Sequence, residues 1–200
     1  MPTRVAVFID YQNCYGWARQ AFHDSEHDPK NYGHLSPMGL AKLVLGMVPD
    51  RVLSYVGVYV GLPNPRLDPA TSSARNKQMA VWSRSSVTIV ARPIRYPRGW
   101  PNVAEKPQEK GVDVKLAIDA LFMAVTKQYE VAVIASSDSD LVPLLEALIM
   151  VKRRIGTPDI ELIAWEGMPY RLRVSGEVLP EREVTRGAYQ TIQDVTDYTS

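Results

Sequence analysis

The chain has 200 residues, of which 46% are hydrophobic and 22% are charged, and its formal net charge is +1. This size and composition fit one globular domain with a core of its own, and the single cysteine, Cys14, excludes an internal disulfide. No apolar run reaches the roughly 18 residues that a membrane-spanning helix needs, so we expect a soluble cytoplasmic protein. The near-neutral charge argues against binding nucleic acid through overall positive charge, although a local basic patch or a metal ion would also attract it.

Five apolar, β-rich runs alternate with helical patterns along the chain. Strands are expected at residues 4–9, 52–61, 87–94, 130–136 and 159–165. Helices are expected after Asn13, after a cap at Ser36, in the segment that ends near Arg84, and over residues 112–125 and 139–149. Strands separated by helices pair in parallel, so we expect a layered α/β fold with a mainly parallel sheet of about five strands. The helix over 112–125 is apolar on most sides, which favours a central position.

Acidic residues follow two of the expected strands. Asp10 ends the first strand, Asp138 and Asp140 follow the fourth, and Asp113 lies in the first turn of the helix over 112–125. Ligands of open parallel sheets bind at the carboxyl ends of the strands, so these acids are expected at one edge of the sheet. Taken singly, each acid is also explained as a helix cap or as a favourable charge at a helix start.

Several carboxylates that converge on one point repel one another unless a cation lies between them. Ligation by oxygen atoms alone, without a nearby cysteine or histidine, suits Mg²⁺ or Mn²⁺. Such sites activate water and stabilise the transition state of phosphodiester hydrolysis. Asn13, close behind Asp10, is expected to orient a water molecule or a carboxylate at this site.

Three motifs, in this order, resemble those of the NYN domain, a family of PIN-like nucleases that includes the LabA-like proteins. They are FIDYQN (8–13), KGVDVKLAIDAL (110–121) and VIASSDSDLVPLLEAL (133–148). The resemblance implies a PIN-like three-layer α/β/α sandwich over residues 1–166, with residues 167–200 as a C-terminal extension packed on it or trailing from it. It also implies a metal-dependent ribonuclease, expected to be an endonuclease, with catalytic and metal-binding acids at Asp10, Asp113, Asp138 and Asp140 and with Asn13 as an accessory residue.

Two of the motifs depart from the common family pattern. Tyr11 stands where many members have glycine, and Ser137 and Leu141 stand where many have glycine and phenylalanine. No proposed ligand is lost through these changes. Tyr11 is nevertheless expected to narrow the mouth of the site and to contact RNA there.

Asp119 also matches the family pattern. Six residues of helix place it about 120° away from Asp113 around the helix axis, which makes a shared metal ion difficult. Lys115 lies four residues before Asp119, so an ion pair between them is the competing interpretation.

The loop before Asp113 carries cations interleaved with aromatic side chains. The candidates for contact with RNA are Arg95, Tyr96, Arg98, Trp100 and Lys110, together with Lys115 in the following helix. Cations contact phosphates, and aromatic rings stack on unpaired bases. The alternative is a solvated loop whose aromatic side chains pack back on the domain.

The leading hypothesis is a Mg²⁺- or Mn²⁺-dependent ribonuclease that hydrolyses single-stranded or structured RNA through its aspartates. The second is a non-catalytic module of the same fold that binds RNA, a nucleotide or a partner protein. The third is a phosphatase-like or DNA-directed metal enzyme, because a carboxylate site does not select its substrate by itself. PIN-like domains often form dimers, so a homodimer is a further possibility.

Overall fold

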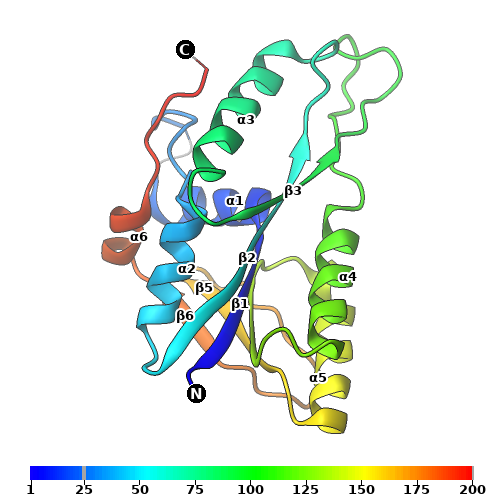
Figure 1. The fold of residues 1–200 in the computed structure, drawn as a ribbon. Coiled ribbons are helices and arrows are strands. Elements are labelled where there is room, and N and C mark those ends of the chain that lie inside the picture. Colours follow the sequence, from blue (N-terminus) through cyan, green and yellow to red (C-terminus); the bar gives the residue numbers. More distant parts are fainter. Residues whose placement is uncertain (24–25, 200) are drawn as a thin grey trace.

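A six-stranded parallel sheet forms the centre of the molecule in the computed structural model, which describes residues 1–23 and 26–199. The strands lie in the order β3-β2-β1-β4-β5-β6, and each neighbouring pair is parallel. Their bounds are β1 (Thr3–Asp10), β2 (Arg51–Leu62), β3 (Thr88–Pro93), β4 (Val131–Ala135), β5 (Asp159–Trp165) and β6 (Glu181–Val184). The carboxyl ends of the strands therefore share one edge, which is the upper edge in Figure 1.

The expected α/β fold class is confirmed, with six strands where the sequence predicts about five. The five expected strands agree with the observed ones within one residue at each end. The additional strand, β6, lies in the segment after residue 166 and pairs with β5. Its sequence, EREV, has three charged residues and no apolar run, so the pattern that reveals the other strands is missing.

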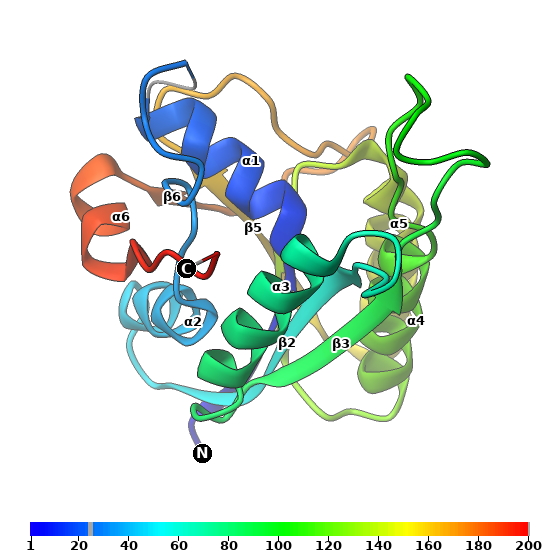
Figure 2. The ribbon, with the colours of Figure 1, turned by 90° about the horizontal axis from the view of Figure 1, so that it is seen from above.

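Helices cover both faces of the sheet, as the view from above in Figure 2 shows. One layer consists of α1 (Tyr11–Phe22), α2 (Pro37–Gly46), α3 (Pro69–Trp82) and α6 (Arg186–Ile192), and the other of α4 (Val112–Val125), the short turn η1 (Ser139–Leu141) and α5 (Val142–Ile155). Along β1, Val7 and Ile9 pack into the first core, whereas Ala6 and Phe8 pack into the second. The result is a three-layer sandwich in which β1 is buried on both faces.

The expectation that the helix over 112–125 is central is wrong. In α4, Leu116 and Ala120 are buried in the second core, but Val114, Ile118 and Phe122 are each more than half exposed. One apolar side of the helix meets the sheet and α5, and the other apolar side lies on the surface of the outer layer. Despite this composition, none of the helices in residues 1–23 and 26–199 combines the length and hydropathy that crossing a membrane requires.

Candidate metal centre

Three carboxylates meet at the carboxyl edge of the sheet. Asp10, Asp113 and Asp138 each offer an oxygen, and these oxygens all lie within 4.8 Å of one another. Asp10 is the last residue of β1, Asp138 follows the neighbouring strand β4, and Asp113 lies in the first turn of α4. Three segments that are distant in sequence are therefore brought together by parallel pairing of β1 with β4 and by packing of α4 beside them.

Asp10 is held in place by hydrogen bonds on both carboxylate oxygens. Its Oδ1 accepts from the backbone N–H of Asn13 at 3.2 Å and so caps α1, and its Oδ2 accepts from the Ser136 hydroxyl at 2.9 Å. The side chain is only 5% exposed. A carboxylate has about four acceptor positions, so capping the helix leaves room for a further ligand. The cap and the metal-binding interpretations of Asp10 are thus compatible.

The turn between β4 and α5 is fixed by a second set of hydrogen bonds. The Ser136 hydroxyl accepts from the backbone N–H of Asp138 at 3.1 Å, and Asp138 Oδ1 accepts from the N–H of Asp140 at 3.0 Å. Asn13 Oδ1 accepts from the N–H of Ser137 at 2.8 Å. Asn13 therefore ties the start of α1 to the turn that carries Asp138.

The three carboxylates have no cationic partner within the described part of the chain. Burial, together with the charges of Asp113 and Glu109, raises the pKa of Asp10 to about 7, although its two hydrogen bonds act in the opposite direction. The pKa of Asp113 is also raised, first by burial and then by the charges of Asp138 and Asp140. Negative charge from several acids is therefore concentrated at this edge of the sheet.

Glu109 adjoins the cluster and was missed by reasoning from sequence. Its carboxylate accepts a hydrogen bond from the N–H of Gly61 at 2.9 Å. Its pKa is raised, first by burial and also by the charge of Asp113, whereas Arg75 lowers it. Its position directly before the KGVD motif was the only available signal, because no strand or helix pattern marks residue 109.

Two other predicted acids lie outside the group of three. Asp140 is exposed, and its carboxylate does not join the three close oxygens, although its charge raises the pKa of Asp113. Asp119 accepts from Lys115 Nζ at 2.5 Å and from the Tyr59 hydroxyl at 3.1 Å. The ion pair that competed with a metal-binding role for Asp119 is therefore formed.

Tyr11 does not lie at the mouth of the site, in contrast to the expectation from its place beside Asp10. Its side chain is completely buried. The hydroxyl lies 3.0 Å from His34 Nδ1 and accepts from Gln78 Nε2 at 2.9 Å. The first turn of α1 is covered by α3 and by the segment around His34, so the ring belongs to the core and does not face RNA.

The loop between β3 and α4 projects beyond the sheet edge (Figure 1) and gathers several of the predicted RNA contacts. Arg95, Tyr96, Arg98 and Lys110 line a pocket of about 300 Å³, together with Glu105 and other loop residues. The rings of Tyr96 and Trp100 are 6.0 Å apart. Their contact with RNA stays a prediction.

Fold and site together define an α/β/α protein with a carboxylate cluster at the carboxyl edge of its parallel sheet. The NYN domain model matches residues 4–157, so the chain belongs to the NYN domain family, as the three motifs indicate. The crystal structure of a protein of unknown function, VPA0982 from Vibrio parahaemolyticus RIMD 2210633, is similar with a TM-score of 0.51 and 13% identity over 81% of each chain. That likeness shows the fold alone. No curated protein matches the chain in sequence.

Proposed function

We propose that this protein is a divalent-metal-dependent ribonuclease that cleaves RNA at the cluster of Asp10, Asp113 and Asp138. The observation that carries the proposal is the convergence of three carboxylate oxygens within 4.8 Å without a cationic partner in the described residues. Membership of the NYN family supports it, because that family belongs to the PIN-like nucleases, which use divalent metal ions and act on RNA.

The cluster fits a small, hard cation. Ligand oxygens of Mg²⁺ lie about 2.1 Å from the ion, so two on opposite sides are about 4.2 Å apart, close to the spread observed here. The donors are all carboxylate oxygens, as Mg²⁺ and Mn²⁺ prefer. Asp10, Asp113 and Asp138 would hold the ion, with Glu109 and Asp140 adding negative charge nearby. When bound, such an ion activates water and neutralises charge that develops on the phosphate.

The surrounding residues keep the acids in position and supply contacts for the RNA backbone. Asn13 and Ser136 fix Asp10 and the turn that carries Asp138 by hydrogen bonds. Lys110 is exposed at the end of the β3–α4 loop, three residues before Asp113, and is the nearest cation of that loop in sequence. Its charge favours approach of a phosphodiester toward carboxylates that would otherwise repel it.

Cleavage of labelled single-stranded RNA in Mn²⁺ or Mg²⁺ tests the proposal. We expect wild-type protein to cleave, and we expect a chelator or Asp138→Asn to abolish cleavage. Asp159→Asn is the matched control, because Asp159 is an exposed acid that pairs with Lys152 away from the cluster. Equal cleavage by wild type and Asp138→Asn would refute the assignment.

Substrate choice and mode of cleavage need separate measurements. We propose endonucleolytic action, for which a circular RNA is a direct probe because it has no ends. Parallel reactions with single-stranded DNA and a small phosphoester distinguish a ribonuclease from a DNA-directed or phosphatase-like enzyme. Tight RNA binding that a chelator leaves unchanged, without cleavage, would instead identify a binding module.

A further inference from the structure

A cavity of about 500 Å³ lies beside the acid cluster, in the size range of small-molecule sites. It is formed by the start of α1, by α3, by residues 29–34 and by residues 196–199. Figure 1 shows α3 and the C-terminal end of the chain at the top of the molecule, above α1. Gln12 lines it and is only two residues after Asp10. The cavity and the acid cluster therefore adjoin at the start of α1.

Arg75 lines the cavity, and its charge also acts on Glu109 beside the acid cluster. It donates to Gln78 Oε1 at 2.7 Å, and its guanidinium lies over the Tyr11 ring, 5.6 Å from the centroid. Within residues 1–23 and 26–199 it has no carboxylate at ion-pair distance, although the charges of Arg75 and Glu109 influence each other. Arg75 is half-buried and has no carboxylate partner among the described residues, so a phosphate would satisfy its remaining donors well.

The wall behind Arg75 is a connected hydrogen-bond network. Gln78, which is 3% exposed, accepts from Arg75 and donates to the Tyr11 hydroxyl. That hydroxyl can donate to His34 Nδ1 at 3.0 Å, because burial lowers the pKa of His34 to about 4 and keeps the ring neutral near pH 7. The proton of His34 then lies on Nε2. Arg75 is thus held in one orientation before any ligand arrives.

The remaining lining suits a nucleotide. The rings of Tyr15 and His34 lie 4.6 Å apart and both line the cavity, which offers aromatic surface for a base. Among the described residues that line it, the charged ones are two cations, Arg75 and Lys30, and one acid, Asp197. An anionic ligand with an aromatic ring is therefore favoured over a cationic or purely apolar one.

We propose that this cavity binds one nucleotide of the RNA substrate, next to the phosphate that is cleaved, with Arg75 holding its phosphate and Tyr15 and His34 contacting its base. The assignment rests on the proposed ribonuclease function. It adds a binding subsite beside α3 to the contacts predicted for the basic loop before α4.

Binding of short single-stranded RNA, measured by fluorescence anisotropy with chelator present, tests this subsite in the cleavage-deficient Asp138→Asn protein. We expect Arg75→Gln to weaken binding about tenfold or more, as loss of a charge-assisted contact to phosphate does. Thr71→Trp should weaken it similarly, because Thr71 is an exposed cavity residue whose enlargement fills the space. Arg84→Gln, an exposed position beyond the far end of α3, should leave affinity within about twofold.

Arg75→Gln removes a charge, whereas Thr71→Trp fills the cavity. The subsite can therefore still be tested if one of these two variants fails to fold. Thr71→Trp leaves the network of Arg75, Gln78 and Tyr11 intact, and thermal unfolding of each variant shows whether it is native. Unchanged RNA affinity in the folded variants, or no RNA binding by the parent protein, would overturn the subsite. If binding depends on Arg75 and Thr71 while wild-type protein never cleaves RNA, the subsite stands and the ribonuclease proposal falls.

Discussion

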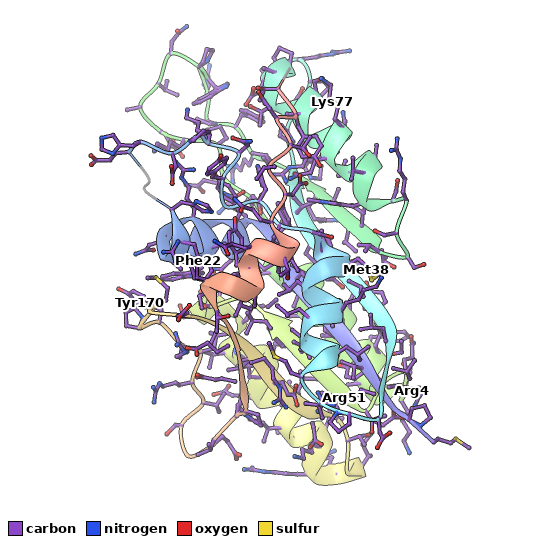
Figure 3. The ribbon with its side chains drawn as sticks, turned by 90° about the vertical axis from the view of Figure 1, so that its left-hand side faces the viewer. Arg4, Phe22, Met38, Arg51, Lys77 and Tyr170 are labelled. Carbon is purple, nitrogen blue, oxygen red and sulfur yellow. The ribbon has the colours of Figure 1, made fainter. Side chains whose placement is uncertain are left out.

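Two buried carboxylates of this protein lie in opposite electrostatic environments. Asp10, at the carboxyl edge of the sheet, has no cationic partner among the described residues, and its pKa is raised to about 7. Glu161, near the start of β5, accepts from Arg51 at 2.7 and 2.9 Å and from Arg182 at 2.5 and 2.8 Å. Burial alone would raise its pKa, but hydrogen bonds from Arg182 and Arg51 lower it to about 2. Figure 3 shows Arg51 at the end of the molecule opposite to Lys77 on α3.

The comparison distinguishes a carboxylate that stabilises the fold from a carboxylate that is available to bind a ligand. At Glu161 the protein itself supplies two guanidinium groups, so the charge is balanced within the fold. At Asp10, burial and then the charges of the neighbouring acids Asp113 and Glu109 raise the free energy of the ionised state until a cation binds. We therefore expect changes at Glu161 to affect stability and changes at the cluster to affect metal binding.

The largest effect on stability is expected from Glu161→Gln. The substitution leaves Arg51 and Arg182 without their shared anion, and breaking such a buried arrangement costs about 3–5 kcal/mol. Urea-induced unfolding measures the loss. Glu183→Gln, an exposed change on the same strand as Arg182, should stay within about 0.5 kcal/mol. Unchanged stability in Glu161→Gln would contradict the structural role that distinguishes Glu161 from Asp10.

Metal-induced stabilisation gives the next largest effect. Mn²⁺ at about 100 times its dissociation constant should stabilise the wild-type fold by about 2.7 kcal/mol, which raises the Tm by about 5–10 °C for a chain of this size. Asp113→Asn should lose most of this shift because it removes one of the three converging oxygens. Glu161→Gln should retain the full Mn²⁺-induced rise in Tm, although its Tm without metal is lower. A full Mn²⁺ shift in Asp113→Asn, measured by differential scanning fluorimetry, would contradict the site.

The raised pKa of Asp10 predicts a pH dependence of stability in metal-free protein. Between the ordinary value of 3.8 and about 7, the folded state keeps a proton that the unfolded chain has lost. Stability therefore falls as pH rises through this window, by up to about 1.4 kcal/mol per pH unit, and this contribution levels off above pH 7. Asp10→Asn does not titrate, so its stability relative to wild type should increase from about pH 5 to pH 7.

Urea unfolding of both proteins in chelator measures this difference. Saturating Mn²⁺ provides an internal control, because metal binds the ionised carboxylate and should stabilise wild type more at pH 7 than at pH 5. A difference between wild type and Asp10→Asn that is constant with pH would show that Asp10 is ionised throughout.

The sequence predicts the acid cluster well because local patterns and one rule of α/β folds are sufficient. Apolar runs locate β1 and β4, and the acids that follow them must lie at the carboxyl edge of a parallel sheet. The environment of Glu161 could not be predicted in this way, because its two partners come from β2 and β6. β6 itself has no apolar pattern.

Tyr11 illustrates the same limit at the site. Its place beside Asp10 suggests exposure at the mouth, but α3 supplies Gln78 and the segment between α1 and α2 supplies His34, and these tertiary contacts bury the ring. Local sequence patterns therefore locate each carboxylate at the end of its own strand or the start of its own helix, whereas contacts from distant segments decide which other side chains surround the cluster.

Glu109 is a third residue whose role at the site depends on a contact from a distant segment. Changes at Glu109 give the smallest expected effect of these predictions. Its carboxylate is held by the Gly61 N–H, and its charge helps to raise the pKa of Asp10. Glu109→Gln should weaken Mn²⁺ binding about tenfold, as loss of a residue adjoining the ligands does. Gly61→Ala should act in the same direction, because an added Cβ would overlap the Glu109 carboxylate and displace it. Glu105→Gln, an exposed change in the same loop, is the control in Mn²⁺ titrations. Wild-type affinity in both variants would show that the charge of Glu109 does not reach the metal.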